Sequence, residues 1–168
     1  MGIGLKQGMT FIDVGCGYGF FSIPAAKIVG TSGRVLGIDI DDEGLQSIKD
    51  STEPLRLKNV ETILGRAEEI IACRGCADVI FFGIVLHDFQ DPYRVISNAK
   101  VMLRSNGILV DIDWRKEETA GMGPPISMRF DERQASDMIS SQGLRITSVS
   151  RSGKYNYIIT ATKNDATL

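Results

Sequence analysis

Three glycines that alternate with other residues give the clearest chemical signal in this chain. They are Gly15, Gly17 and Gly19, and they follow a short apolar run that ends at the acid Asp13. Alternating glycines let the backbone turn sharply and let a ligand lie against bare main chain. A second acid, Asp39, follows the loop by about twenty residues, where a carboxylate can accept hydrogen bonds from ribose hydroxyls. The spacing therefore predicts a site for a ligand that contains ribose.

Two classes of ligand use such a loop, and the residues around it favour one of them. A dinucleotide needs a third glycine where this chain has Phe20, because the helix must pack closely on the strand there. Asp13 is also poorly placed beside a pyrophosphate and suits a positively charged ligand better. A tight turn without any ligand, and a role for Asp39 as a simple helix N-cap, stay open as alternatives.

Candidate proton-transfer groups follow the later strands. His87, the single histidine, comes directly after an apolar run with Asp88 beside it, and imidazole titrates in the range that proton transfer needs. A histidine that merely caps the next turn would fit the same position. Trp114 follows the next strand and suits stacking on a flat acceptor or core packing equally. Tyr155, at a hairpin tip, is the second candidate for the acceptor pocket, although strand aromatics are common.

The cysteines predict neither a metal site nor a redox site. Cys73 and Cys76 form a lone pair with two residues between them, and no second pair or nearby histidine completes a zinc site. A redox motif would open a helix after a strand, whereas this pair precedes a strand. We therefore expect a surface loop there. Three cysteines, with Cys16, are an odd and low number, which fits a reducing compartment.

Strand-like and helix-like stretches alternate along the chain, which predicts a parallel sheet with helices on both faces. The strands are expected at residues 10–14, 35–38, 60–64, 77–82, 108–112, 144–150 and 156–162. The helices are expected at residues 20–29, from 41 to about 53, 91–103 and 131–143. The fold class is thus α/β: a doubly wound, mostly parallel sheet of about seven strands whose last strand runs antiparallel. Ligands of such sheets bind outside the carboxyl ends of the strands.

Length and charge limit the partners. The chain has 168 residues, which suits one domain over residues 1–168. Its net charge is -2, so no overall positive field would hold a nucleic acid, and a small-molecule acceptor is favoured. The N-terminus has no signal-peptide pattern and no apolar run is long enough to span a bilayer. From these features we expect a cytoplasmic protein.

Several segments together resemble the class I methyltransferases that use S-adenosylmethionine (SAM). The chain is most similar to type 11 methyltransferase domains, among them small prokaryotic members whose substrates are mostly unassigned. The segments that carry the resemblance are Phe11–Gly19, Val35–Asp39, Ala77–Asp88, Leu103–Leu109, Asp113–Lys116 and Gly123–Pro125. The resemblance implies a Rossmann-like methyltransferase fold, SAM as cofactor, and transfer of a methyl group to an unidentified acceptor.

The resemblance also implies roles for matching residues. In this family the glycine loop holds the methionine part of SAM, the acid after the second strand holds ribose, and the next residue packs on adenine. Carried over, these positions are Asp13, Gly15, Cys16 and Gly17 in the glycine-loop segment, Asp39 for ribose and Ile40 for adenine. The resemblance also implies that the backbone carbonyl of Gly83, after the fourth strand, approaches the methionine ammonium. Many relatives place an adenine-binding acid after the third strand, but this chain has Arg66 there. Adenine recognition is then expected from Ala67 or Glu68.

A second departure concerns the N-terminus. The first expected strand starts at Thr10, whereas relatives carry helices before it that cover the donor. We therefore expect this helical lid to be missing, or to be supplied by a partner chain or a second copy. The alternative function is that of a non-catalytic SAM-binding subunit that needs such a partner. A nucleotide-dependent oxidoreductase is a weaker alternative, because Phe20 breaks the dinucleotide pattern.

Overall fold

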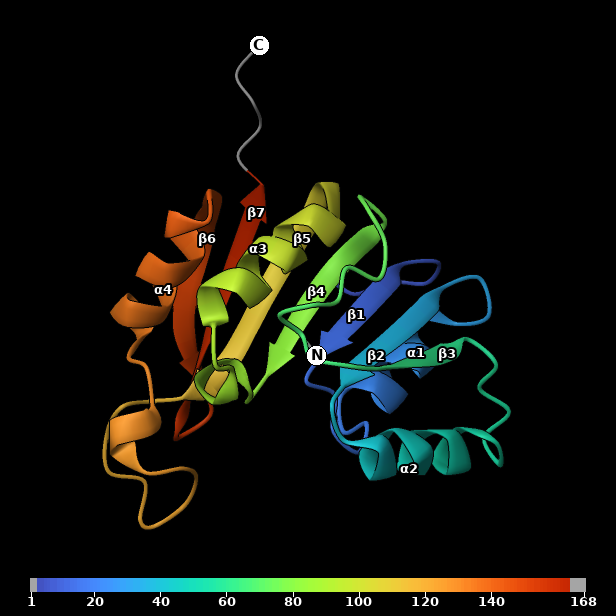
Figure 1. The fold of residues 1–168 in the computed structure, drawn as a ribbon, viewed down its shortest axis with the longest axis horizontal. Coiled ribbons are helices and arrows are strands. Elements are labelled where there is room, and N and C mark those ends of the chain that lie inside the picture. The colour runs from blue at the N-terminus through green and yellow to red at the C-terminus, as the bar shows by residue number, and fades with distance from the viewer. Residues whose placement is uncertain (1–2, 164–168) are drawn as a thin grey trace.

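A seven-stranded sheet runs through the molecule. The structure, a computed structural model, describes residues 3–163. The strands lie in the order β3-β2-β1-β4-β5-β7-β6 (Figure 1). They are β1 (Thr10–Val14), β2 (Arg34–Asp39), β3 (Val60–Leu64), β4 (Ala77–Gly83), β5 (Leu103–Trp114), β6 (Leu144–Ser152) and β7 (Asn156–Lys163). The α-helices are α1 (Ser22–Val29), α2 (Asp42–Thr52), α3 (Pro92–Met102) and α4 (Glu132–Ser141).

The first five strands are parallel, and β7 lies antiparallel between β5 and β6. The predicted doubly wound sheet with an antiparallel last strand is therefore confirmed. The chain order reverses at β1, which pairs with β2 on one side and with β4 on the other. A crevice outside the carboxyl ends of the strands is the usual ligand site at such a point.

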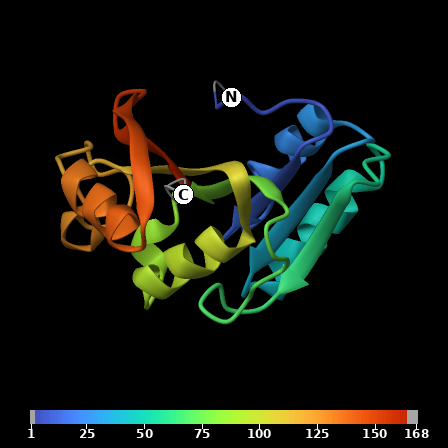
Figure 2. The same ribbon diagram turned by 90° about the horizontal axis from the view of Figure 1, so that it is seen from above.

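Helices cover both faces of the sheet, as the view from above shows (Figure 2). On one face, α3 and α4 pack their apolar residues against the strands. On the other, α1 packs over β1 and β4, joined by Ile3, Leu5 and Met9 of the N-terminal segment. Because both faces are covered, the centre strand β4 is apolar along most of its length, with residues 79–82 buried.

The expected starts of α2, α3 and α4 are confirmed by their capping contacts. The carboxylate of Asp91 accepts from the backbone N–H of Arg94, with Pro92 as the first helical residue. Asp131 and Gln134 form a reciprocal capping box at α4. Asp41 caps α2. These caps fix where the loops at the carboxyl edge end.

Two predicted boundaries are wrong. Helix α1 begins at Ser22 rather than residue 20, which leaves Phe20 in the glycine loop and 80% exposed. Strand β5 begins at Leu103 rather than residue 108, so Asn106 and Gly107 lie within the strand and do not form a turn. The cause is pairing with β4: Ala77 pairs with Leu103 and Val79 with Ile108, so residues 104–107 form an irregular stretch within the strand, and a Cβ on Gly107 would meet the Ala77 carbonyl oxygen at 2.6 Å.

The loop before β4 also differs from expectation, because Cys73 and Cys76 form a disulfide. The sequence predicts a surface loop there and a reducing compartment, and it does not predict this bond. The bond lies at the amino end of β4, the opposite end of the strand from the glycine loop. Within residues 3–163, no helix is both long and apolar enough to cross a membrane.

Candidate functional site

The glycine loop holds its shape through contacts that exclude larger residues. The backbone N–H of Gly15 donates to the carbonyl oxygen of Ile38 at 2.8 Å, which ties the loop to the end of β2. Gly15 has a φ of +73°, and a Cβ there would overlap the side chain of Val85. Only glycine relieves both restrictions, so bare backbone faces the space beyond β1.

Asp39 ends β2 with its carboxylate partly satisfied by the loop. Oδ2 accepts from the Gly17 N–H at 2.7 Å and Oδ1 accepts from the Asp41 N–H at 3.0 Å. A carboxylate offers about four lone-pair sites, so each oxygen retains one for a ligand hydroxyl. Asp39 is therefore fixed in orientation and able to accept two more hydrogen bonds.

A cavity of about 400 Å³ opens at the carboxyl ends of β1, β2 and β4. Six of the predicted site residues line it: Gly15, Asp39, Ile40, Ala67, Glu68 and Asp88. Ile40 is 67% exposed, so an apolar ring could cover its side chain. Arg66, noted in the sequence where relatives have an acid, also lines the cavity, and residues that the sequence did not single out complete the walls: Ile38, Gly65, Ile84, Val85, Phe89 and Gln90.

Asp13 lies behind the loop and does not line this cavity. Its Oδ2 accepts from the Ser22 hydroxyl at 2.6 Å, and the side chain is fully buried. Burial, partly offset by the Ser22 hydrogen bond and reinforced by the charge of Asp39, raises the pKa of Asp13 to about 7. The structure places Asp13 beneath the glycine loop, and its predicted contact with SAM stays a prediction.

Three further predicted donor residues also lie outside the cavity lining. Gly17 donates its N–H to Asp39, as above. Cys16 is buried, and burial first, then the charges of Asp13 and Asp39, raises the pKa of its thiol. A thiol in that environment stays protonated and is a poor nucleophile. A Cβ on Gly83 would overlap the ring of Phe21.

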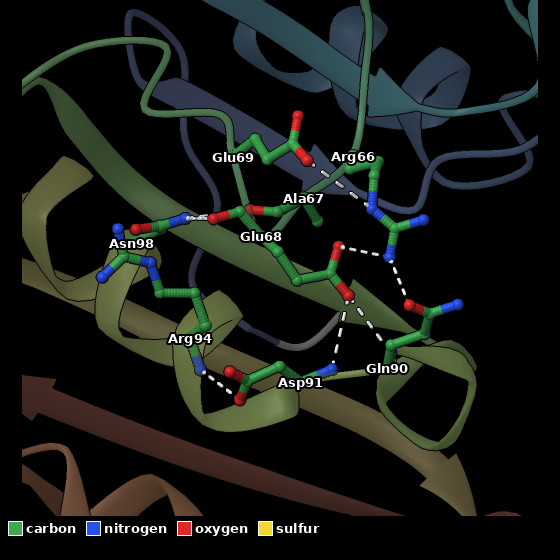
Figure 3. Close-up of polar contacts among 8 residues, drawn as sticks. All are labelled: Arg66, Ala67, Glu68, Glu69, Gln90, Asp91, Arg94 and Asn98. Carbon is green, nitrogen blue, oxygen red and sulfur yellow. Dashed lines mark hydrogen bonds and ion pairs between the residues drawn. The ribbon is translucent and has the colours of Figure 1, made fainter.

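The wall formed by the loop after β3 is a network of polar contacts (Figure 3). Glu68 Oε1 accepts from the backbone N–H groups of Gln90 and Asp91, at 3.1 and 3.4 Å. The guanidinium of Arg66 donates to Gln90 Oε1 at 2.9 Å. The amide of Asn98 in α3 donates to the carbonyl oxygens of Ala67 and Glu68. These bonds join the loop after β3 to the loop after β4.

His87 is brought against Asp113, which lies 26 residues further along the chain. Its Nδ1 lies 2.8 Å from both carboxylate oxygens of Asp113, and its Nε2 lies 3.5 Å from Asp88 Oδ1. Burial lowers the pKa of His87, but the hydrogen bond and charge of Asp113 outweigh it, so the pKa is raised overall. The His87 side chain is only 4% exposed.

Trp114 and Tyr155, the predicted acceptor-side residues, do not line the cavity. Trp114 packs against Gly123, and the Arg129 guanidinium lies 5.4 Å from its ring centre. The main-chain carbonyl oxygen of Tyr155 accepts a hydrogen bond from the backbone N–H of Arg115 at 2.8 Å, and the Lys154 ammonium lies over the Tyr155 ring. Both residues lie at the carboxyl edge of the sheet, as expected, and their role toward an acceptor stays a prediction.

One wall residue has an unusual backbone. Ile84 has a φ of +61°, a left-handed conformation that is rare for a β-branched side chain. Its N–H donates to the carbonyl oxygen of Ile112 at 2.7 Å, which anchors the turn after β4 to β5. Such strain is held in place by the surrounding structure and is typical of functional sites.

These walls fit an adenosyl ligand with a positive charge. Bare backbone at Gly15 leaves room for the donor to lie against the main chain. Asp39 has two available acceptors, which suit the ribose hydroxyls, and Ile40 offers an apolar face, which suits the adenine ring. Asp88 adds a half-exposed carboxylate, and the single cation of the described lining, Arg66, is engaged with Gln90 and lies near Glu68. Negative charge at the cavity stabilises a bound cation.

Comparison with known proteins agrees with this geometry. The sequence matches the family described as a methyltransferase domain over residues 5–158. A demethylmenaquinone methyltransferase of Oceanobacillus iheyensis is 28% identical over 117 residues, which are 70% of this chain and 49% of that protein. The chain thus spans about half the length of the curated relatives it matches.

Two solved structures share the fold and more than a quarter of the aligned residues. A SAM-dependent methyltransferase of Aquifex aeolicus is 32% identical with a TM-score of 0.90, covering 96% of this chain and 85% of its own. A protein of Sulfolobus solfataricus described as a type 11 methyltransferase is 28% identical with a TM-score of 0.77, covering 94% and 85%. The chain therefore belongs to the class I, SAM-dependent methyltransferase family, in its type 11 group.

Proposed function

We propose that this chain transfers a methyl group from SAM to a small organic acceptor at the carboxyl edge of the sheet. The observation that carries the proposal is the cavity of about 400 Å³, where the bare backbone of Gly15 and the fixed carboxylate of Asp39 share one wall. This arrangement suits an adenosyl ligand, and the family match makes a dinucleotide-dependent oxidoreductase the poorer reading of the same loop.

SAM supplies a methyl group bound to a positively charged sulfur, so its departure needs no acid from the protein. The protein has to align the acceptor with that methyl and exclude water. Asp39 would accept the ribose hydroxyls, and Gly15 would let the donor lie against the main chain. Ile40 and Phe89 would cover the base.

An acceptor methylated at a hydroxyl group, or on a ring carbon next to one, must lose a proton. We propose that the proton passes from the acceptor through the cavity-lining Asp88 to His87 Nε2, which lies 3.5 Å from Asp88 Oδ1, because the His87 side chain is 4% exposed and does not line the cavity. Asp113 holds the ring through Nδ1 and stabilises the imidazolium that results, so Asp113 acts as a positioning residue. When the acceptor gains the methyl group, His87 thus holds the displaced proton.

The curated relatives act, by name, on demethylmenaquinone. A quinol, the reduced form of a quinone, is a flat ring with ionisable hydroxyl groups, which matches the proton acceptor proposed above. The net charge of -2 also favours a small molecule over a nucleic acid. A quinol is therefore the acceptor to test first.

The test is formation of S-adenosylhomocysteine from SAM in the presence of demethylated naphthoquinols and simple phenols. We expect acceptor-dependent turnover, and we expect His87→Gln to lower kcat about 10²-fold or more while SAM affinity changes little. Asp113→Asn should lower kcat and shift the pH–rate profile, whereas Asp137→Asn, an exposed residue of α4, should change neither. Binding of SAM with no turnover on any acceptor would contradict catalysis by this chain and favour the non-catalytic subunit.

A further inference from the structure

We propose that the Gln90 side chain reads the base edge of the donor adenine and that Arg66 holds its carboxamide in the reading orientation. This inference rests on the proposed function, because it assigns a specificity-determining residue to the donor cavity. It also gives Arg66, which stands where many relatives have an adenine-binding acid, a role in donor recognition.

The orientation of the carboxamide follows from the chemistry of its neighbour. Arg66 Nη2 lies 2.9 Å from Gln90 Oε1. A guanidinium has donors and no acceptor, so the oxygen of the amide must face Arg66 and its NH₂ group must face away. Within residues 3–163 the NH₂ group of Gln90 makes no hydrogen bond, and Gln90 lines the cavity.

The main chain of Gln90 is fixed from the same wall. Glu68 Oε1 accepts its N–H at 3.1 Å, and the carbonyl oxygen of Glu68 is in turn held by Asn98 at 2.8 Å. Figure 3 shows Arg66 and Glu68 reaching Gln90 from the loop after β3. Two polar side chains of that loop, Arg66 and Glu68, therefore position one residue of the opposite wall, in its side chain and in its backbone.

A carboxamide held in this way matches adenine. Adenine presents an amino donor next to a ring-nitrogen acceptor, and a Gln amide pairs with that edge through its oxygen and its NH₂ group. The second lone pair of Oε1 remains available while Arg66 uses the first. Hypoxanthine carries an oxygen where adenine carries the amino group, so it would require the amide to turn over and to present NH₂ to Arg66.

The two side chains of the loop after β3 that position Gln90 cannot do the same. Arg66 has no acceptor for the adenine amino group. Glu68 Oε1 already accepts two N–H groups, and its Oε2 lies 3.6 Å from Arg66. The Glu68 side chain is 15% exposed, so little of it can reach a ligand. Of Arg66, Glu68 and Gln90, Gln90 is thus the side chain with both a donor and an acceptor available.

Calorimetric titration with S-adenosylhomocysteine and S-inosylhomocysteine tests the inference without any turnover. We expect the unmodified protein to prefer the adenosyl ligand roughly 10- to 100-fold, since a bidentate amide–base pair discriminates by that order. Gln90→Ala should reduce the ratio to within about threefold, and Arg66→Met should reduce it while the affinity for the inosyl ligand rises. Glu69→Gln is the matched control, because Glu69 lies 3.9 Å from Arg66, is 73% exposed and lies outside the cavity.

The outcomes separate this inference from the proposed function. Binding of S-adenosylhomocysteine with an unchanged ratio in Gln90→Ala and Arg66→Met would overturn the inference and assign adenine recognition to the backbone near Ala67. Absence of binding to either ligand by the unmodified protein would overturn the proposed function, and the inference with it. Circular dichroism of each variant confirms that the fold is retained, which is expected because both side chains lie at the surface.

Discussion

Two acids near the donor cavity show how burial decides the state of a side chain. Asp39 is tied by two N–H groups at the surface of the cavity, whereas Asp13 is fully buried and bonded to Ser22. The sequence pattern places both acids beside the glycine loop and does not distinguish them. The difference arises from packing, because α1 covers the end of β1 and leaves the end of β2 open.

Asp13 should make the stability of the ligand-free protein depend on pH. Its pKa rises from the ordinary 3.8 to about 7, so between these values the folded protein keeps a proton that the unfolded chain has released. The free energy of unfolding should therefore fall with rising pH in this window, by at most about 1.4 kcal/mol per pH unit, and level off above it. Urea unfolding of the unmodified protein and Asp13→Asn at several pH values measures the difference.

In Asp13→Asn this fall should disappear, because an amide does not titrate. Asp42→Asn is the control, since Asp42 is exposed in the first turn of α2. Equal pH dependence in all three proteins would show that Asp13 titrates normally in the folded state.

At Ile84, substitution by glycine should destabilise the protein less than substitution by alanine, which is the reverse of the usual order in strands. At ordinary strand positions glycine is less stable than alanine by roughly 0.5–1 kcal/mol. At the left-handed φ of +61° alanine keeps the strain and glycine removes it. Ile84→Gly should thus be more stable than Ile84→Ala by about 1 kcal/mol.

Thermal or urea unfolding checks the order, with Ile112 as the matched site in β5. There, Ile112→Ala should be more stable than Ile112→Gly, since Ile112 is an ordinary strand residue. The same order at both sites would mean that Ile84 carries no backbone strain.

At the scale of elements, the segment between β5 and α4 is organised by one buried cation. The Arg129 side chain donates five hydrogen bonds and packs over Trp114. The acceptors are the carbonyl oxygens of Arg115, Glu117, Met122 and Pro124 and the hydroxyl of Thr119. Its guanidinium donors are satisfied by this one loop, so the loop can keep a fixed shape with only a short 3-10 helix at Ile126–Met128.

Replacing Arg129 should loosen this loop. A lysine keeps the charge but its three donors cannot reach five acceptors, so Arg129→Lys should lower the free energy of unfolding by roughly 1–3 kcal/mol. The fluorescence of Trp114, the single tryptophan, and proteolysis within residues 115–128 report the change directly. The control is Arg133→Lys, an exposed residue of α4. Unchanged fluorescence and proteolysis in Arg129→Lys would show that the loop does not depend on this side chain.

The sequence predicts elements well where local signals and packing agree. The caps at Asp91 and Asp131 mark α3 and α4 because a capping side chain acts within its own turn. The start of β5 was missed because Asn106 and Gly107 resemble a turn locally, while pairing of Leu103 with Ala77 extends the strand. Pairing between distant strands outweighs a local turn signal there.

Over the whole molecule, the sheet order follows from alternating elements and the position of the glycine loop, so the site could be placed at the carboxyl edge in advance. Contacts between residues far apart in the chain could not be placed in advance. The bond of His87 to Asp113 spans 26 residues and that of Arg66 to Gln90 spans 24. Each depends on which loops the finished sheet brings together, and no local pattern around Gln90 marks it as a cavity residue.

The cavity beside Asp39 is the proposed site of the SAM donor, and calorimetric titration with S-adenosylhomocysteine measures binding there. We expect micromolar or tighter binding that Asp39→Ala weakens by about 100-fold, because two charge-assisted hydrogen bonds of the ribose would be lost. Asp42→Ala, which alters an exposed acid three residues away, should bind like the unmodified protein. Absence of binding, or equal binding by Asp39→Ala, would show that this cavity is not the donor site.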